Sequence, residues 1–149
     1  MKKLIPALLL LGASVPALAE DVTYTKHIRP IWEDRCERCH GASAPDYGTF
    51  MKDTRTYELD DKGPRMDTYG SLMFFVNGAE EAGALMQRLD DGSNTKDGQP
   101  GNMYRHLGRT EPRKENLQRF KEWIGEGAWF VKKTDEITQE ELQKIKAAN

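Results

Sequence analysis

The sequence contains little cysteine and little histidine. Its only two cysteines, Cys36 and Cys39, lie three positions apart, and the 149 residues include three histidines. Cysteines this close cannot join distant parts of the chain, so a fold held together by a disulfide framework is excluded. A structural zinc site takes four ligands, which would consume nearly every cysteine and histidine present, so zinc is disfavoured.

Long apolar runs are also missing, except at the N-terminus. There, Lys2 and Lys3 precede an apolar run from Leu4 to Val15, which is followed by Ala17-Leu18-Ala19. This order predicts a Sec-type signal peptide over residues 1–19, cleaved after Ala19, and therefore a periplasmic protein. The run is shorter than the roughly 20 residues of a membrane-spanning helix, so we expect no transmembrane segment after cleavage; a retained anchor is the alternative.

The chain has no excess of positive charge. Without Lys2 and Lys3, 20 of the 22 basic residues remain against 24 acidic residues, a formal charge of −4. This balance argues against a nucleic-acid partner. The remaining length suits a single domain, which we expect to be a monomer, with the domain over residues 20–130 and a C-terminal extension over residues 131–149.

Patterns typical of β-strands are absent as well. No run of β-branched residues alternates over four or more positions, so the sequence predicts an all-α protein. Helical periodicity favours a first helix that starts between Lys26 and Arg29, with Pro30 in its first turn, and runs to Cys39. It also favours two short helices, over Tyr69–Val76 and Ala79–Leu89.

The remaining segments differ in composition. Residues 42–67 are rich in Asp, Gly, Pro, Lys and Thr without a sustained period, which predicts a long loop that holds at most a short turn of helix. Thr110 is expected to cap a helix that ends at Gly125 or Gly127. Thr138 begins a capping box, which indicates a short amphipathic tail helix.

The segment Cys36-Glu37-Arg38-Cys39-His40 has the C-x-x-C-H spacing of covalent haem attachment. On a helical turn, positions i and i+3 present two thiols on one side, where they can add to the two vinyl groups of a haem. Position i+4 places the imidazole of His40 beneath the iron as an axial ligand. A C-x-x-C disulfide or a thioredoxin-like dithiol is the alternative, but it requires a βαβ context that this sequence lacks.

The sixth iron ligand is open among several methionines and histidines. Met73 and Met86 lie in periodic segments typical of core positions, and Met103 follows a strap bent by Gly98, Pro100 and Gly101. The other candidates are Met51, Met66, His27 and His106.

The sequence resembles the class I c-type cytochromes. The matching features are Cys36 to Gly41, Gly83 to Leu89, a lone Met in a Gly/Pro-rich strap, and Trp123-Ile124 with Gly127-Ala128. The resemblance implies helices wrapped around one haem c, with Met103 as the distal ligand. Proline is often found beside that methionine in the family, whereas Tyr104 follows it here, and the stretch from Ala44 to Thr68 exceeds the family minimum.

These observations favour an electron-transfer protein rather than an enzyme. We expect a periplasmic monohaem cytochrome that passes single electrons between redox partner proteins. A permanently docked subunit of an oxidoreductase and a haem gas sensor with a labile sixth ligand are the alternatives. The alternating Asp91, Ser93, Thr95 and Asp97 resemble a calcium loop, but the Gly and the closing Glu are missing, which favours a solvated acidic loop.

Overall fold

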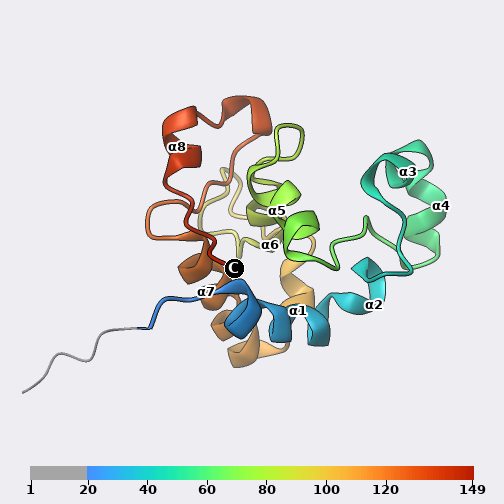
Figure 1. The fold of residues 1–149 in the computed structure, drawn as a ribbon, viewed down its shortest axis with the longest axis horizontal. Helices are drawn as coiled ribbons and strands as arrows, with labels where there is room; N and C mark the ends of the chain where they lie inside the picture. Colours follow the sequence, from blue (N-terminus) through green and yellow to red (C-terminus); the bar gives the residue numbers. More distant parts are fainter. Residues whose placement is uncertain (1–19) are drawn as a thin grey trace, which may run out of the picture.

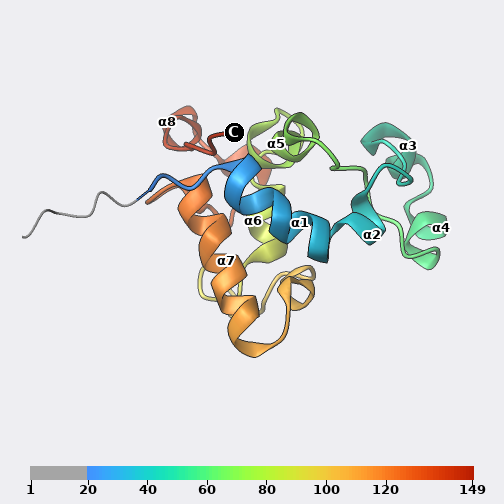
Figure 2. The ribbon, with the colours of Figure 1, turned by 60° about the horizontal axis from the view of Figure 1, so that its bottom comes forward.

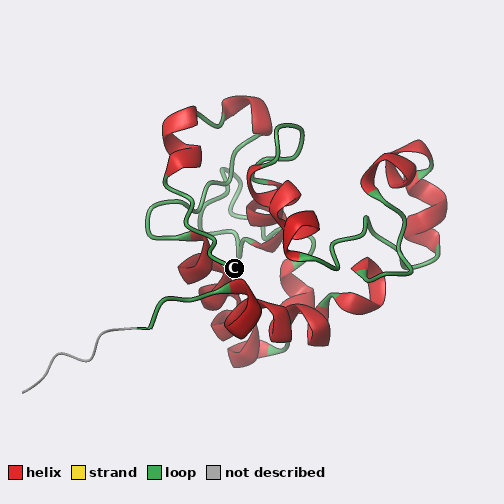
Figure 3. Cartoon of the chain, viewed as in Figure 1, coloured by secondary structure: helices red, strands yellow, loops and turns green. Residues whose placement is uncertain are grey.

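The computed structural model describes residues 20–149, which form helices and loops without any strand (Figure 3). The predicted all-α class is confirmed. The predicted signal peptide, residues 1–19, lies outside the described residues. No helix within the described part is long and apolar enough to span a bilayer.

The N-terminal helical run delivers the C-x-x-C-H segment. A π-helical turn, η1 (Tyr24–Ile28), continues into α1 (Arg29–Arg35), and α2 (Glu37–His40) follows after a break at Cys36. Pro30 lies in the first turn of α1, where its missing N–H costs no hydrogen bond. The predicted helix is therefore present, although it begins earlier than expected and bends at Cys36.

Two helices lie where the sequence predicted a loop. They are α3 (Tyr47–Lys52) and α4 (Thr54–Leu59), so residues 42–67 contain more helix than the single short turn that the prediction allowed. The side chain of Asp46 accepts a hydrogen bond from the Thr49 N–H at 2.9 Å, and the side chain of Asp53 accepts one from the Thr56 N–H at 3.2 Å. These aspartate caps begin helices too short to show a period.

The α3–α4 pair stands apart from the other helices (Figures 1 and 2). Tyr47 connects it to the rest of the fold: its ring centroid lies 5.1 Å from that of Phe74 and 5.8 Å from that of Phe75. The Tyr47 hydroxyl also donates to Glu81, and this hydrogen bond raises the pKa of Tyr47 to about 12. Tyr47 thus packs the α3–α4 pair against α5 and links it to Glu81.

The middle helices are α5 (Tyr69–Asn77) and α6 (Ala84–Leu89). The predicted second helix was expected to start at Ala79, but residues 79–83 form a turn. Gly83 has a φ of 80°, a left-handed conformation that interrupts a right-handed helix, and a Cβ there would lie 2.6 Å from Ile137. The close approach of Ile137 is a tertiary contact that periodicity does not report.

The longest helix, α7 (Thr110–Ile124), follows a short 3₁₀ turn, η2 (Tyr104–Leu107). The predicted capping role of Thr110 is wrong, because Arg109 occupies the cap position and Thr110 is the first helical residue, with a φ of 41°. The helix ends at Ile124 with Gly125 as its C-cap, and Gly125 is one of the two predicted stop positions.

The core lies where α1, α5, α6 and α7 converge (Figure 1). Each large core side chain removed from water contributes roughly 1.5–3 kcal/mol. The largest apolar side chains that are less than 2% exposed are Ile28, Leu72, Val76, Met86, Leu107, Phe120, Trp123 and Ile124.

The C-terminal tail completes this core. After η3 (Thr134–Glu136) and the predicted tail helix α8 (Gln139–Gln143), the chain returns to the body, where Ala147 is fully buried. The Ala148 carbonyl accepts hydrogen bonds from the Tyr24 N–H at 2.7 Å and from Trp123 Nε1 at 2.8 Å. Residues 131–149, expected to be an extension, are therefore built into the same core as the preceding residues.

Candidate haem-attachment site

One helical turn holds both cysteines and His40. The N–H of Cys39 donates to the Cys36 carbonyl at 3.1 Å, and the N–H of His40 donates to the same carbonyl at 2.9 Å. Neither thiol is in a disulfide, and both cysteines are half-buried. The turn thus has the local geometry that the spacing predicted.

The environment of Cys36 disfavours a redox-active dithiol. Burial raises the pKa of the Cys36 thiol to about 12, whereas reactive dithiols depend on a thiol whose pKa is lowered. Within residues 20–149, no group of three or more His, Cys, Asp or Glu side chains is placed to hold a metal ion. The raised pKa of the Cys36 thiol therefore disfavours the dithiol alternative.

His40 is oriented by a hydrogen bond that the sequence did not reveal. Its Nδ1 lies 2.8 Å from the carbonyl oxygen of Pro64. A carbonyl can only accept, so Nδ1 carries the proton and Nε2 keeps its lone pair, which is the tautomer that binds a metal through Nε2. Burial lowers the pKa of His40, which further favours the neutral imidazole.

The imidazole of His40 lies against the backbone of Gly63, where a larger residue would leave it no room. Its N–H donates to the Cys39 carbonyl at 3.0 Å, and the N–H of Met66 donates to the His40 carbonyl at 2.8 Å. These bonds hold residues 63–66 beside the C-x-x-C-H turn. A Cβ at Gly63 would lie 2.6 Å from His40 Nδ1, which no side chain tolerates.

We expect Gly63→Ala to displace His40 and to lower the free energy of unfolding by about 1–3 kcal/mol, because the added methyl group overpacks the imidazole. The matched control is Gly70→Ala in α5, where a Cβ would meet nothing within 4 Å and should be neutral or slightly stabilising. Chemical denaturation of both variants measures the difference. Equal stabilities would contradict the role assigned to Gly63.

Met103 lies in a strap fixed against α6. Its N–H donates to the Arg88 carbonyl at 2.9 Å, and the N–H of Gly101 donates to the Asp90 carbonyl at 2.9 Å. A Cβ at Gly101 would lie 2.5 Å from the carbonyl carbon of Arg88, so only glycine allows this approach. The Met103 side chain is half-buried and packs against the core at the start of η2.

The strap depends on a buried carboxylate. Asp90 is fully buried, and its side chain accepts hydrogen bonds from the Gly92 N–H, Asn94 Nδ2 and Trp129 Nε1, each at 2.8 Å. Asp91 accepts from the Ser93 hydroxyl at 2.6 Å. The carboxylates of Asp90 and Asp91 thus accept hydrogen bonds from the loop itself, and Asp90 also ties the loop to Trp129.

The remaining ligand candidates occupy other environments. Met86 is fully buried, and its sulfur accepts a hydrogen bond from the Phe130 N–H at 3.3 Å, as suits a core residue. Met73 also packs against the core, and Met51 is 56% exposed. His106 is exposed, and its Nε2 accepts from Arg105 Nε at 3.1 Å.

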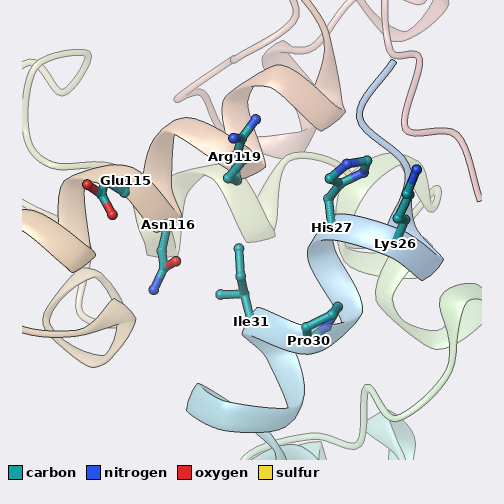
Figure 4. A pocket seen from close by; sticks show the side chains of 7 residues that line it. All are labelled: Lys26, His27, Pro30, Ile31, Glu115, Asn116 and Arg119. Atoms are coloured by element: carbon teal, nitrogen blue, oxygen red, sulfur yellow. The ribbon is translucent and has the colours of Figure 1, made fainter. Parts of the chain in front are cut away.

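His27 lines a pocket of about 610 Å³ between α1 and α7 (Figure 4). Its Nδ1 accepts a hydrogen bond from the Thr23 N–H at 3.0 Å. Neither the cysteines nor His40 lines this pocket, so the structure does not bring His27 to the attachment site. The pocket residues are Lys26, His27, Pro30, Ile31, Glu115, Asn116 and Arg119.

The indole of Trp32 gives a further indication that another group completes this region. Trp32 Nε1 is buried and has no hydrogen-bond partner among residues 20–149, and an unsatisfied buried donor costs about 1–3 kcal/mol. Trp32 lies on α1 one helical turn before Cys36, so both residues belong to the same side of the helix. Together with the free thiols and the available Nε2 of His40, these residues fit a covalently attached haem.

Sequence reasoning missed Gly63 and Pro64. The Gly-Pro dipeptide is a turn signal, but nothing in the local sequence says that this turn lies against an imidazole more than twenty residues earlier. Residues 20–149 thus combine an all-α fold, one C-x-x-C-H turn and a fixed histidine tautomer. These features define the class of monohaem c-type cytochromes.

Comparison with known proteins extends this assignment to a particular family. A family model described as PccH Cytochrome c matches residues 23–148. The chain belongs to the PccH cytochrome c family, and it binds one haem c covalently. The solved structure of the monoheme cytochrome PccH from Geobacter sulfurreducens is 48% identical, with a TM-score of 0.78, and the match covers 87% of this chain and 100% of that chain. No curated protein sequence matches.

Membership of this family confirms the predicted monohaem c-type class and its single haem c. It also assigns the chain an electron-carrier role.

Proposed function

We propose that the chain is an exported carrier of single electrons whose haem iron is held by His40 and Met103. The observation that carries this proposal is the hydrogen bond from His40 Nδ1 to the Pro64 carbonyl, which leaves Nε2 available as an axial ligand. The haem supplies the redox chemistry, because its iron gains and loses one electron.

The residues of this chain have separate roles in that function. Cys36 and Cys39 would hold the haem as thioethers, each formed by addition of its S–H group across one vinyl group. The Pro64 carbonyl and Gly63 hold the His40 ring. The apolar side chains of α1 and α7 would exclude water from the haem. Ligation by both His40 and Met103 would leave no open site for a small molecule, which suits a carrier rather than an enzyme or a gas sensor.

Location and partners are part of the same proposal. The signal-peptide pattern of residues 1–19 supports export to the periplasm, where the partners would be redox proteins. The alternative of a permanently docked subunit is favoured by one observation: the exposed large hydrophobic residues of the described chain, Met51 and Leu59, both lie on the α3–α4 pair. Elution of the purified protein as a monomer would count against permanent docking.

The carrier function is tested by a spectroelectrochemical titration of the purified protein. We expect a reversible transition with a slope of about 59 mV per decade, as a one-electron couple requires. Carbon monoxide should bind the reduced protein slowly or not at all at neutral pH. Rapid binding would instead support the gas-sensor alternative.

A further inference from the structure

Positive charge is concentrated in one segment of an acidic protein. Residues 20–149 carry a formal charge of −4, yet residues 103–114 contain Arg105, Arg109, Arg113 and Lys114 against the single acid Glu111. This segment begins at Met103 and includes η2 and the start of α7. The charge near Met103 is therefore opposite in sign to the charge of the whole protein.

Within residues 20–149, the arginines near Met103 also have no acidic partner. Ten arginines lie within residues 20–149, and half of them have a carboxylate oxygen within 4.0 Å in this part of the chain; these are Arg29, Arg35, Arg38, Arg65 and Arg119. Four of the other five, all except Arg55, lie in α6, in η2 or at the start of α7; they are Arg88, Arg105, Arg109 and Arg113. Their charge is not neutralised within the described residues.

The contacts these arginines make are with neutral groups. Arg88 Nη1 donates to Asn102 Oδ1 at 3.3 Å, and the Arg88 carbonyl accepts from the Met103 N–H. Arg113 Nε donates to the Gly108 carbonyl at 2.8 Å, and its guanidinium lies 5.3 Å from the centroid of the Tyr104 ring. These contacts hold two of the guanidinium groups in place without removing their charge.

The four arginines come from three elements that meet at the strap. Arg88 belongs to α6, Arg105 to η2, and Arg109 and Arg113 to the start of α7. The turn η2 contacts α1, α6 and α7, and Figure 2 shows it beside the end of α7 that lies away from α8. Arg88, Arg105 and Arg109 are exposed, and Arg113 is half-exposed.

We propose that Arg88, Arg105, Arg109 and Arg113 form a docking surface that receives a carboxylate-rich patch of a redox partner protein beside Met103. This proposal rests on the proposed carrier function. Guanidinium groups bind carboxylates through two parallel hydrogen bonds, and a local field of one sign accelerates encounter with a partner of the opposite sign. Electron exchange then occurs at the face nearest the Met103 ligand.

Small redox reagents of opposite charge provide a direct test. The chemically reduced protein is mixed in a stopped-flow instrument with hexacyanoferrate(III), an anion, or with tris(phenanthroline)cobalt(III), a cation; each accepts one electron while the haem iron goes from Fe(II) to Fe(III). Net charge alone predicts attraction to the cation. The arginine surface predicts that the rate with the anion falls as ionic strength rises from about 0.01 M to 0.5 M, and that the rate with the cation does not.

Charge reversal gives the second measurement. At low ionic strength, Arg105→Glu with Arg109→Glu should slow oxidation by hexacyanoferrate(III) about tenfold. The control is Lys133→Glu with Lys146→Glu on the C-terminal tail, which changes the net charge by the same amount and should slow the reaction less than twofold. Absorption spectra check that each variant retains its haem, and the salt dependence of the unmodified protein tests the proposal without any variant.

Three results would overturn the proposal. The first is a rate with the anion that rises with ionic strength. The second is an equal effect of both double variants. The third is a reduced protein that neither reagent oxidises, which would also remove the carrier function, whereas the first two results leave that function intact.

Discussion

An exported chain in which Cys36 and Cys39 are both replaced by alanine is expected to carry no covalently attached haem. Both thioethers require these sulfurs, and the chain has no other cysteine. The unmodified protein should keep its haem during acidified solvent extraction and should weigh one haem more than its amino acids. The double variant should weigh no more than its amino acids, and extraction should remove any colour it has.

The single variants Cys36→Ala and Cys39→Ala act as controls for folding and export. Each retains one thioether position, so each should hold some haem through a single bond while the double variant holds none. Mass spectrometry of the three denatured variants distinguishes these states. Haem that stays with the denatured double variant would show that the C-x-x-C-H turn is not the attachment site.

Met103→Ala is expected to change the coordination and the reduction potential of the haem iron more than any other methionine substitution. Loss of the Met103 sulfur would remove the weak far-red sulfur-to-iron charge-transfer band of the oxidised protein. It would also open a site for carbon monoxide in the reduced protein. Because methionine ligation raises the reduction potential, the potential of the variant should fall by on the order of 0.1 V, within the ~0.8 V range that axial ligands span.

Two other methionines provide matched controls. Met51 is 56% exposed on α3, and Met73 packs against the core in α5, so alanine at either position should leave the band in place. The band would persist in Met103→Ala if another methionine were the ligand. Absence of the band from the unmodified protein would instead favour His106, which follows Met103 by three residues, as the sixth iron ligand.

The sequence predicted best the features that depend on neighbours within one or two helical turns. The spacing of Cys36, Cys39 and His40 fixes their relation on any helix, and the structure has that turn. The stop of α7 at Gly125 and the capping box at Thr138 are equally local. Such signals act over a few residues, so they can be read without knowledge of the fold.

The errors arose where short segments or distant contacts decide the structure. The helices α3 and α4 have six residues each, too few for a period, and their aspartate caps lie in a polar composition typical of loops. The turn over residues 79–83 depends on Gly83 lying against Ile137, more than fifty residues later. At the start of α7, Arg109, whose backbone is extended, lies at the cap position in place of Thr110.

The amino-acid sequence by itself determined the helical class, the C-x-x-C-H turn and the glycine-rich strap that leads to Met103, because each depends on backbone preference or spacing along one segment. Only the tertiary structure decided the tautomer of His40 and the cluster of arginines around the strap. The Pro64 carbonyl reaches His40 across 24 positions, and Arg88 meets Met103 across 15. Contacts of that range form when helices pack, and no local pattern encodes them.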